Sequence, residues 1–218
     1  MANRFTPLSD PLYDYLLAQG TREDELLKEL RAETARLGRP ARMQIAPDQG
    51  AFLQLLVAAI GARQALEIGT FTGYSSICIA RGLGPQGRLL CLDVSDAWTE
   101  IARRYWRRAQ LEEHIELRLA PALDTLTALP REPRLDFAFI DADKLGYLAY
   151  YEEILVRTRS GGLIAVDNVL REGRVADLTE RDDETRAMRR FNEVVAADPR
   201  VEIAMIAVAD GLTLARKL

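Results

Sequence analysis

The sequence predicts an α/β domain in which helices cover both faces of a mostly parallel β-sheet. From residue 61 onward, short apolar segments alternate with amphipathic stretches, which is the pattern of βαβ units. The last two strand-like segments are instead separated only by Ala209-Asp210-Gly211, and Asp-Gly is a strong hairpin signal. We therefore expect a seven-stranded sheet with a C-terminal antiparallel hairpin.

Length and composition are those of one globular domain. The chain has 218 residues, of which 48% are hydrophobic and 28% charged. We expect a single domain over 1–218, with N-terminal helices in 1–60 and the α/β core in 61–218. The net charge of −4 offers no footprint for nucleic acid or anionic lipid. Residues 1–7 lack the apolar core of a signal peptide, so we expect a cytoplasmic protein without a membrane partner.

The first third of the chain predicts helices. Thr21 and Asp24 have the spacing of a capping box before the apolar face of 26–30, and Gly38 ends this run. Pro47 stands where the first turn of a further helix would begin, continuing to about residue 60. These helices precede the alternating pattern.

The later segments supply the strands and their connecting helices. The predicted strands are 65–68, 88–94, 115–119, 135–140, 163–166, 201–208 and 212–216. Cys78 falls in a helix and Cys91 in a strand, so both are expected to be core residues rather than a disulfide pair or a metal site. His114 is the only histidine and lies in a predicted surface turn, which argues against a histidine metal site or a Ser-His-Asp triad.

A glycine-containing loop follows the first strand. Gly69 and Gly73 are four residues apart and precede a helix that starts near Tyr74, an arrangement typical of nucleotide binding. The loop lacks the G-x-G-x-x-G pattern and any basic residue to offset a pyrophosphate, so a nucleoside cofactor without phosphate fits better. Asp93 ends the next strand, where its carboxylate either accepts ribose hydroxyls or simply caps the strand end.

Acidic and amide side chains follow two further strands. Asp141 ends one strand, and Asp167 and Asn168 end the next, so their side chains should lie about 5 Å apart if these strands are neighbours. Such oxygen ligands suit Mg²⁺, Mn²⁺ or Ca²⁺, although acids at strand ends also cap helices. Lys144 falls at the predicted start of a helix, where a positive charge is unfavourable, so helix stability does not explain its position. The alternative is an ordinary surface lysine.

The run 66–76 resembles the donor-binding motif of the catechol and caffeoyl-CoA O-methyltransferase family. The resemblance continues through 43–56, 120–123, 141–144, 161–170 and 210–213. It implies the Rossmann-like class I methyltransferase fold and the methyl donor S-adenosylmethionine (SAM). It further implies a catechol-like vicinal diol as acceptor and a homodimer formed through the N-terminal helices. Our mechanistic hypothesis is direct displacement at the methyl group.

The resemblance also implies roles for individual residues. The amino-acid part of SAM would lie among Glu67, Gly69, Thr70 and Ser75, the ribose at Asp93, and the adenine near Ala122 and Asp143. The metal ligands would be Asp141, Asp167 and Asn168, with Lys144 as general base. Thr70 and Ser75 could also cap the helix after the loop, which is compatible with ligand contact. Trp106 is expected in the core, whereas Trp98 could pack on adenine or in the core.

Several alternatives stay open at this stage. The charged segment 170–190 is either a solvated loop entering a helix or a lid beside the site. Glu172 stands where the plant enzymes have asparagine, which argues against a plant-like preference for caffeoyl-CoA. The rival functions are a nicotinamide-dependent oxidoreductase on a similar sheet and a non-catalytic module that keeps only the fold.

Overall fold

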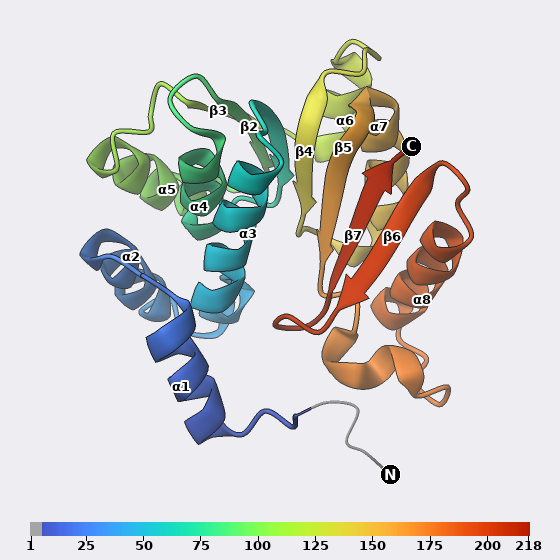
Figure 1. Cartoon of the computed structure of the whole chain (residues 1–218), viewed down its shortest axis with the longest axis horizontal. Coiled ribbons are helices and arrows are strands. Elements are labelled where there is room, and N and C mark those ends of the chain that lie inside the picture. The colour runs from blue at the N-terminus through green and yellow to red at the C-terminus, as the bar shows by residue number, and fades with distance from the viewer. Residues whose placement is uncertain (1–5) are drawn as a thin grey trace.

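The computed structural model describes residues 6–218 and contains one seven-stranded sheet (Figure 1). Met1 to Phe5, on which part of the targeting expectation depends, lie outside the described residues. The strands are β1 (Gln64–Ile68), β2 (Arg88–Asp93), β3 (Ile115–Leu119), β4 (Leu135–Ile140), β5 (Thr158–Asp167), β6 (Val201–Ile206) and β7 (Leu212–Lys217). Their order is β3-β2-β1-β4-β5-β7-β6. Pairings among β1 to β5 are parallel and both pairings of β7 are antiparallel, which confirms the predicted sheet and hairpin.

Helices cover both faces of the sheet. They are α1 (Asp10–Gly20), α2 (Glu25–Ala35), α3 (Pro47–Ala59), α4 (Tyr74–Leu83), α5 (Asp96–Arg108), α6 (Ala122–Ala128), α7 (Tyr147–Arg157) and α8 (Asp183–Ala196). Three short 3₁₀ segments join them: η1 (Arg39–Met43), η2 (Lys144–Gly146) and η3 (Arg171–Ala176). One buried cluster lies under α2 to α5, and the other lies under α6 to α8.

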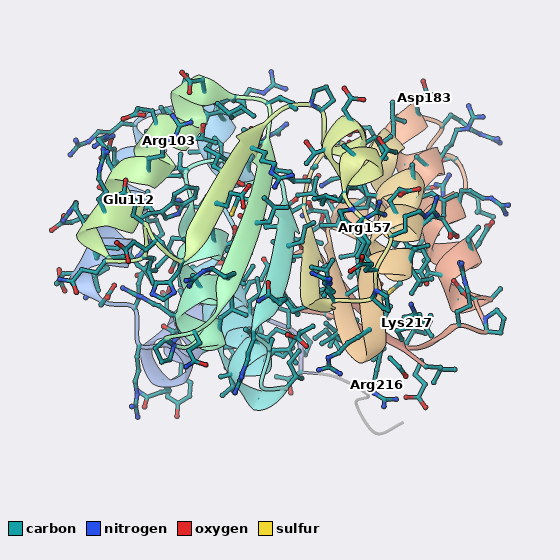
Figure 2. All side chains as sticks on the ribbon, turned by 90° about the horizontal axis from the view of Figure 1, so that it is seen from above. Arg103, Glu112, Arg157, Asp183, Arg216 and Lys217 are labelled. Atoms are coloured by element: carbon teal, nitrogen blue, oxygen red, sulfur yellow. The ribbon has the colours of Figure 1, made fainter. Side chains whose placement is uncertain are left out.

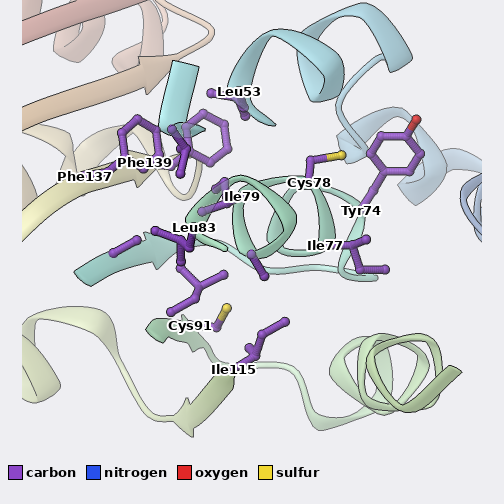
Figure 3. Packing of buried hydrophobic residues seen from close by; sticks show 14 of the residues in the cluster. Leu53, Tyr74, Ile77, Cys78, Ile79, Leu83, Cys91, Ile115, Phe137 and Phe139 are labelled. Carbon is purple, nitrogen blue, oxygen red and sulfur yellow. The ribbon is translucent and has the colours of Figure 1, made fainter. Parts of the chain in front are cut away.

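The central strands contribute side chains to both clusters. Along β4, Phe137 and Phe139 pack under α3 and α4 (Figure 3), whereas Ala138 and Ile140 face α7. Because both faces are buried, these strands are almost continuously apolar. Burial on both faces also fixes the register, since a shift of one residue would exchange the two sets of side chains. Ile140 therefore pairs with both Ile68 and Val166, and the chain segments that follow these three strands start side by side.

The structure corrects the predicted capping box. Thr21 is the residue that ends α1, where its hydroxyl donates to the carbonyl oxygen of Leu17. Asp24 alone caps α2, by accepting a hydrogen bond from the amide of Leu27 at 3.0 Å. The sequence spacing was ambiguous because both residue types favour the ends of helices.

Two strand boundaries differ from the prediction by more than one residue. β5 begins at Thr158, five residues earlier than expected, since Thr158 pairs with Leu135 before a register shift. The prediction missed this part because it contains Gly161 and Gly162, which usually mark turns. β6 ends at Ile206, and the hairpin loop is longer than the three residues expected.

Charged side chains such as Arg103, Glu112 and Asp183 lie at the outside of the molecule (Figure 2). Across residues 6–218, none of the helices has the length and apolar character needed to cross a lipid bilayer.

Candidate active site

A cavity of about 1310 Å³ lies at the carboxyl edge of the central strands. The ends of β1, β2, β4 and β5 contribute to its wall, together with the starts of α4 and α6, residues 42–46 and η3. The predicted site residues in this wall are Gly69, Thr70, Ser75, Asp93, Ala122, Asp141, Asp143, Lys144, Asp167 and Asn168. Glu67 is the exception, because it lies behind the wall. The fold thus brings the predicted residues to one place.

The glycines of the loop after β1 are required by contacts within the chain. Gly69 has φ +89°, and a Cβ atom there would lie 1.8 Å from the carbonyl oxygen of Asp141. Gly73 has φ +91°, and its Cβ would lie 2.7 Å from Cβ of Ala102. The glycines therefore let β1 approach β4 and α4 approach α5, in addition to the close ligand approach inferred from the sequence.

Glu67 is a fully buried carboxyl group beneath this loop. Its Oε2 accepts a hydrogen bond from Sγ of Cys91 at 3.4 Å, whereas Oε1 has no partner. Burial raises the pKa of Glu67 to about 7. The buried hydroxyl of Thr70 likewise has no partner, so it does not cap α4 as the alternative prediction proposed. Unpartnered polar atoms beside a cavity are expected where a polar ligand completes the hydrogen bonds.

Asp93 shapes the loop directly. Its Oδ2 accepts hydrogen bonds from the amides of Thr70 and Phe71, both at 2.9 Å, and its Oδ1 accepts from Val94 and Ser95 at 2.7 and 2.8 Å. A carboxylate offers about four acceptor positions, so these backbone amides use its ordinary capacity. A ribose hydroxyl would have to share an oxygen with them.

The two tryptophans of α5 occupy different environments. Trp106 is buried and donates from Nε1 to Oγ of Ser76 at 2.8 Å, which confirms its predicted place in the core. Trp98 lies in the cavity wall and meets Phe71 edge to face, with ring centroids 5.1 Å apart. Ala122 lies in the same cavity wall, so Trp98 and Ala122 could border a flat ring.

Lys144 links a carboxylate at the end of β4 with an amide oxygen just after β5. Nζ of Lys144 donates to Oδ1 of Asp141 at 3.2 Å, to Oδ1 of Asn168 at 2.7 Å and to the hydroxyl of Tyr147 at 2.6 Å. Asp167 accepts the amide of Asn168 at 2.7 Å. Lys144 is thus no ordinary surface lysine, and these contacts explain its position at the start of η2.

Two acidic side chains, Asp141 and Asp167, stand against one basic side chain, Lys144, at these strand ends. Burial raises the pKa of Asp141, although Lys144 opposes the shift. Burial and the charge of Asp141 raise the pKa of Asp167 to about 7. Within residues 6–218, no three His, Cys, Asp or Glu side chains gather around a possible metal position. A metal bound here would therefore need the amide oxygen of Asn168 beside the two carboxylates.

The remaining candidate residues make no side-chain hydrogen bond with Lys144, and His114, Cys78 and Cys91 also lie outside the cavity wall. His114 is half-buried at the opposite end of the sheet, where its ring nitrogen bonds Arg88 or the carbonyl oxygen of Gly87. Cys78 and Cys91 are free and buried, which confirms their predicted place in the core. Asp143 accepts the amide of Gly146 and so caps η2, while its side chain also reaches the cavity.

Sequence reasoning missed three residues of the site region. Gln49, in the first turn of α3, is buried in the cavity wall. Gln44 donates to the hydroxyls of Thr34 and Thr72 at 3.0 and 3.1 Å, which links the N-terminal segment to the loop between β1 and α4. Tyr147 contacts Lys144. The spacing of Lys144 and Tyr147, three residues apart at a helix start, was the one available signal.

The segment 170–190 borders the cavity and is partly helical. It forms η3 and the start of α8, and Arg171, Glu172, Arg174 and Glu184 lie in the cavity wall. It therefore enters a helix and also borders the cavity, whereas its role as a lid stays a prediction.

Comparisons with known proteins agree with this geometry. The family model described as O-methyltransferase matches residues 18–218. Probable caffeoyl-CoA O-methyltransferase 1 of Dictyostelium discoideum is 42% identical over 175 residues, which cover 78% of this chain and 76% of the relative. Catechol O-methyltransferase domain-containing protein 1 of Mus musculus is 37% identical over 215 residues, covering 97% and 82%.

Solved structures show the same fold with ligand bound. The O-methyltransferase from Bacillus cereus, in complex with SAH, is 40% identical, with a TM-score of 0.85 over 94% of this chain and 96% of that one. TomG from Streptomyces achromogenes, in complex with SAM, is 33% identical, with a TM-score of 0.86 over 94% of each chain. Neither the oxidoreductase nor the non-catalytic alternative survives these findings. The chain belongs to the caffeoyl-CoA and catechol O-methyltransferase-like family and is a SAM-dependent O-methyltransferase with the class I methyltransferase fold.

Proposed function

We propose that this enzyme methylates one hydroxyl of a catechol-like vicinal diol with the help of a divalent cation. The proposal is carried by four side chains that converge in one wall of the cavity: Asp141, Asp167, Asn168 and Lys144. The loop between β1 and α4, which we assign to SAM, lines the same cavity. A diol has two adjacent oxygens, which is what a cation with open coordination positions can hold.

The residues present fit such a cation. Asp141, Asp167 and the amide oxygen of Asn168 are hard oxygen ligands, which favours Mg²⁺, with Mn²⁺ or Ca²⁺ as alternatives. Burial raises the pKa of both carboxyl groups, and the charge of Asp141 raises that of Asp167 further; a divalent cation bound between them would offset both effects. Bound there, the cation would orient the two hydroxyls and lower the pKa of one of them.

We assign the donor contacts to the loop and strand ends described above. Gly69, Thr70 and Ser75 would bind the amino-acid part of SAM, with the charge of Glu67 behind them. Asp93 would face the ribose by sharing its carboxylate oxygens, and Ala122 and Asp143 would lie near the adenine. The unpartnered hydroxyl of Thr70 and Oε1 of Glu67 support the first assignment.

Lys144 is the proposed general base. After releasing its own proton to solvent, Nζ would take the proton of the reacting hydroxyl, the oxygen would attack the methyl group in line, and SAH would leave. Holding the oxygen and the methyl group close together supplies much of the rate. Since the positive charge on sulfur disappears with the charge on oxygen, exclusion of water by the cavity wall favours the transfer.

Donor affinity should depend on the ionisation of Glu67. The pKa of Glu67 is raised to about 7, so the carboxyl is largely neutral below that pH. The positive charges of SAM favour the ionised form, and binding below pH 7 therefore requires loss of a proton. We expect calorimetry to show SAM affinity falling several-fold from about pH 8 to about pH 6. Glu67→Gln should bind weakly with no such slope, and an equal slope in this variant would refute the role of Glu67.

We also propose that the chain forms a homodimer through its N-terminal helices. Helix α1 buries no residue within the chain, and Tyr15 and Leu55 expose 64% and 69% of their surface. Tyr15 lies on α1 and Leu55 on α3, two helices in contact with each other, and an exposed apolar surface commonly marks a protein contact. Sedimentation should give a dimer for the wild type and a monomer for Leu55→Glu. A wild-type monomer would contradict the proposal.

The acceptor class can be tested by comparing catechol with phenol. The purified enzyme is incubated with SAM, Mg²⁺ and either compound, and the product is quantified by mass spectrometry. We expect singly methylated catechol, with phenol slower by about a hundredfold or more because one oxygen cannot chelate. Caffeoyl-CoA is tested as a third acceptor. We expect no preference for it, because Glu172 in the cavity wall stands where the plant enzymes have asparagine. Equal rates on phenol and catechol would overturn the diol assignment.

A further inference from the structure

Lys144 has one partner that is not a proposed metal ligand. Of its three hydrogen bonds, two go to Asp141 and Asn168, and the third goes to the hydroxyl of Tyr147 at 2.6 Å. This third contact is the shortest. Nζ also lies 4.7 Å from the centre of the Tyr147 ring, so the ring places its electrons close to the ammonium group.

Tyr147 is held rigidly in the fold. It is the first residue of α7 and is fully buried. Its ring meets Phe191 of α8 edge to face, with centroids 5.8 Å apart and an interplanar angle of 82°. Burial raises the pKa of the Tyr147 hydroxyl well above its usual value, so the group stays neutral. A neutral, fixed hydroxyl can accept a hydrogen bond from an ammonium group without adding charge to the site.

The three partners of Lys144 would respond differently when the site is loaded. The proposed cation needs the oxygens of Asp141 and Asn168, which now accept hydrogen bonds from Nζ. Two positive centres compete for the same oxygens and repel each other. Tyr147 is outside this competition. Without its hydroxyl, the flexible lysine side chain would keep no hydrogen bond to an oxygen that the cation does not also claim, and only the weaker contact with the ring would remain.

We propose that Tyr147 is a positioning residue that holds Lys144 beside the reacting oxygen while the neighbouring oxygens bind the cation. This inference rests on the proposed role of Lys144 as general base. Tyr147 does not line the cavity, so its hydroxyl would act on the lysine and touch neither the donor nor the acceptor. Its loss should slow the proton transfer and leave the binding of SAM and of the cation unchanged.

The test compares two buried tyrosines of the same helix. Tyr147→Phe removes the hydroxyl and keeps the ring. Tyr151→Phe is the matched control, because Tyr151 is also fully buried and packs on Phe191 at 5.9 Å, while its hydroxyl bonds Asp198 away from the cavity. We expect kcat on catechol to fall about ten- to hundredfold in Tyr147→Phe, the range for a lost hydrogen bond to a charged group. The control should stay within about twofold.

Binding measurements separate positioning from general damage. The KM for SAM and the Kd for Mn²⁺, measured by electron paramagnetic resonance, should change less than about twofold in Tyr147→Phe. Parallel losses of kcat, SAM binding and Mn²⁺ binding would indicate a structural defect and overturn the inference. An unchanged kcat in Tyr147→Phe would overturn it as well.

A double variant shows whether Tyr147 acts through Lys144. If it does, adding Tyr147→Phe to Lys144→Met should cost no further activity, because the lysine to be positioned is gone. A further loss equal to that of the single variant would contradict the inference. Full activity in Lys144→Met alone would remove the proposed base and this inference together. Loss in Lys144→Met with no effect of Tyr147→Phe would leave the proposed function standing and refute only the positioning role.

Discussion

Replacing Asp167 with asparagine is expected to reduce methyl transfer more than about a hundredfold, since residues that merely support metal ligands already cost about ten- to hundredfold. The substitution keeps the shape of the side chain and removes one of the two carboxylate charges. Initial rates on catechol at saturating Mg²⁺ measure the loss. A variant that keeps more than half of the wild-type rate would exclude Asp167 as a ligand.

The same substitution should stabilise the protein in the presence of a chelator. The pKa of Asp167 is raised from its ordinary value to about 7, so the folded state resists ionisation of this group. For an acid with a raised folded pKa, its contribution to stability is greatest at low pH and is lost as the pH rises through about 7. Asp167→Asn should therefore melt at a higher temperature than the wild type above that pH. Asp167→Asn should thus lower activity and raise the melting temperature, because residues placed for binding often lower the stability of the folded protein.

Asp136, near the start of β4 and away from the cavity, provides a matched control for Asp167→Asn. Burial alone would raise its pKa, but a hydrogen bond from Arg159 and those from two backbone amides outweigh burial and lower it. Asp136→Asn should therefore lower the melting temperature and leave catalysis intact. If both Asp variants changed stability in the same direction, the electrostatic account of the carboxyl pair would be wrong.

Lys144→Met is expected to lower kcat by about a hundred- to ten-thousandfold, the usual contribution of a general base. The metal should bind more tightly in this variant, because the ammonium group that competes for Asp141 and Asn168 is absent. Stopped-flow or steady-state rates and Mn²⁺ titrations of the same preparation measure both effects.

Lys28→Met is the control for the loss of a lysine, because Lys28 lies exposed on α2 beside Glu25. It should change neither kcat nor Mn²⁺ affinity. Weaker metal binding in Lys144→Met would show that the lysine supports the ligands instead of competing with the cation. An unchanged kcat would remove it from the mechanism.

The sequence predicted the centre of the sheet well because β1, β4 and β5 are largely buried on both faces. Such strands are continuous apolar runs, as in 135–140, and their ends fall where the chain turns polar. The prediction failed where tertiary contacts override local preference. Thr158 joins β5 because it pairs with Leu135, and nothing in the polar segment around it indicates this.

The site could be predicted in position more than in detail. Asp141, Asp167 and Asn168 follow adjacent strands, so their convergence follows from the rule that parallel strands end at one edge. The four amide contacts of Asp93 could not be predicted, since they depend on how the loop curls around the carboxylate. Nor could the contact of Tyr147 with Lys144, which depends on the exact turn between η2 and α7.

The most direct test of the metal-assisted mechanism is the rate on catechol before and after removal of divalent cations. The enzyme is treated with a chelator, dialysed, and assayed with SAM while Mg²⁺ is added back. We predict that the treated enzyme loses more than about nine-tenths of its rate and regains it with saturable dependence on Mg²⁺. A rate that is the same with and without the chelator, on enzyme shown to be free of metal, would contradict the account.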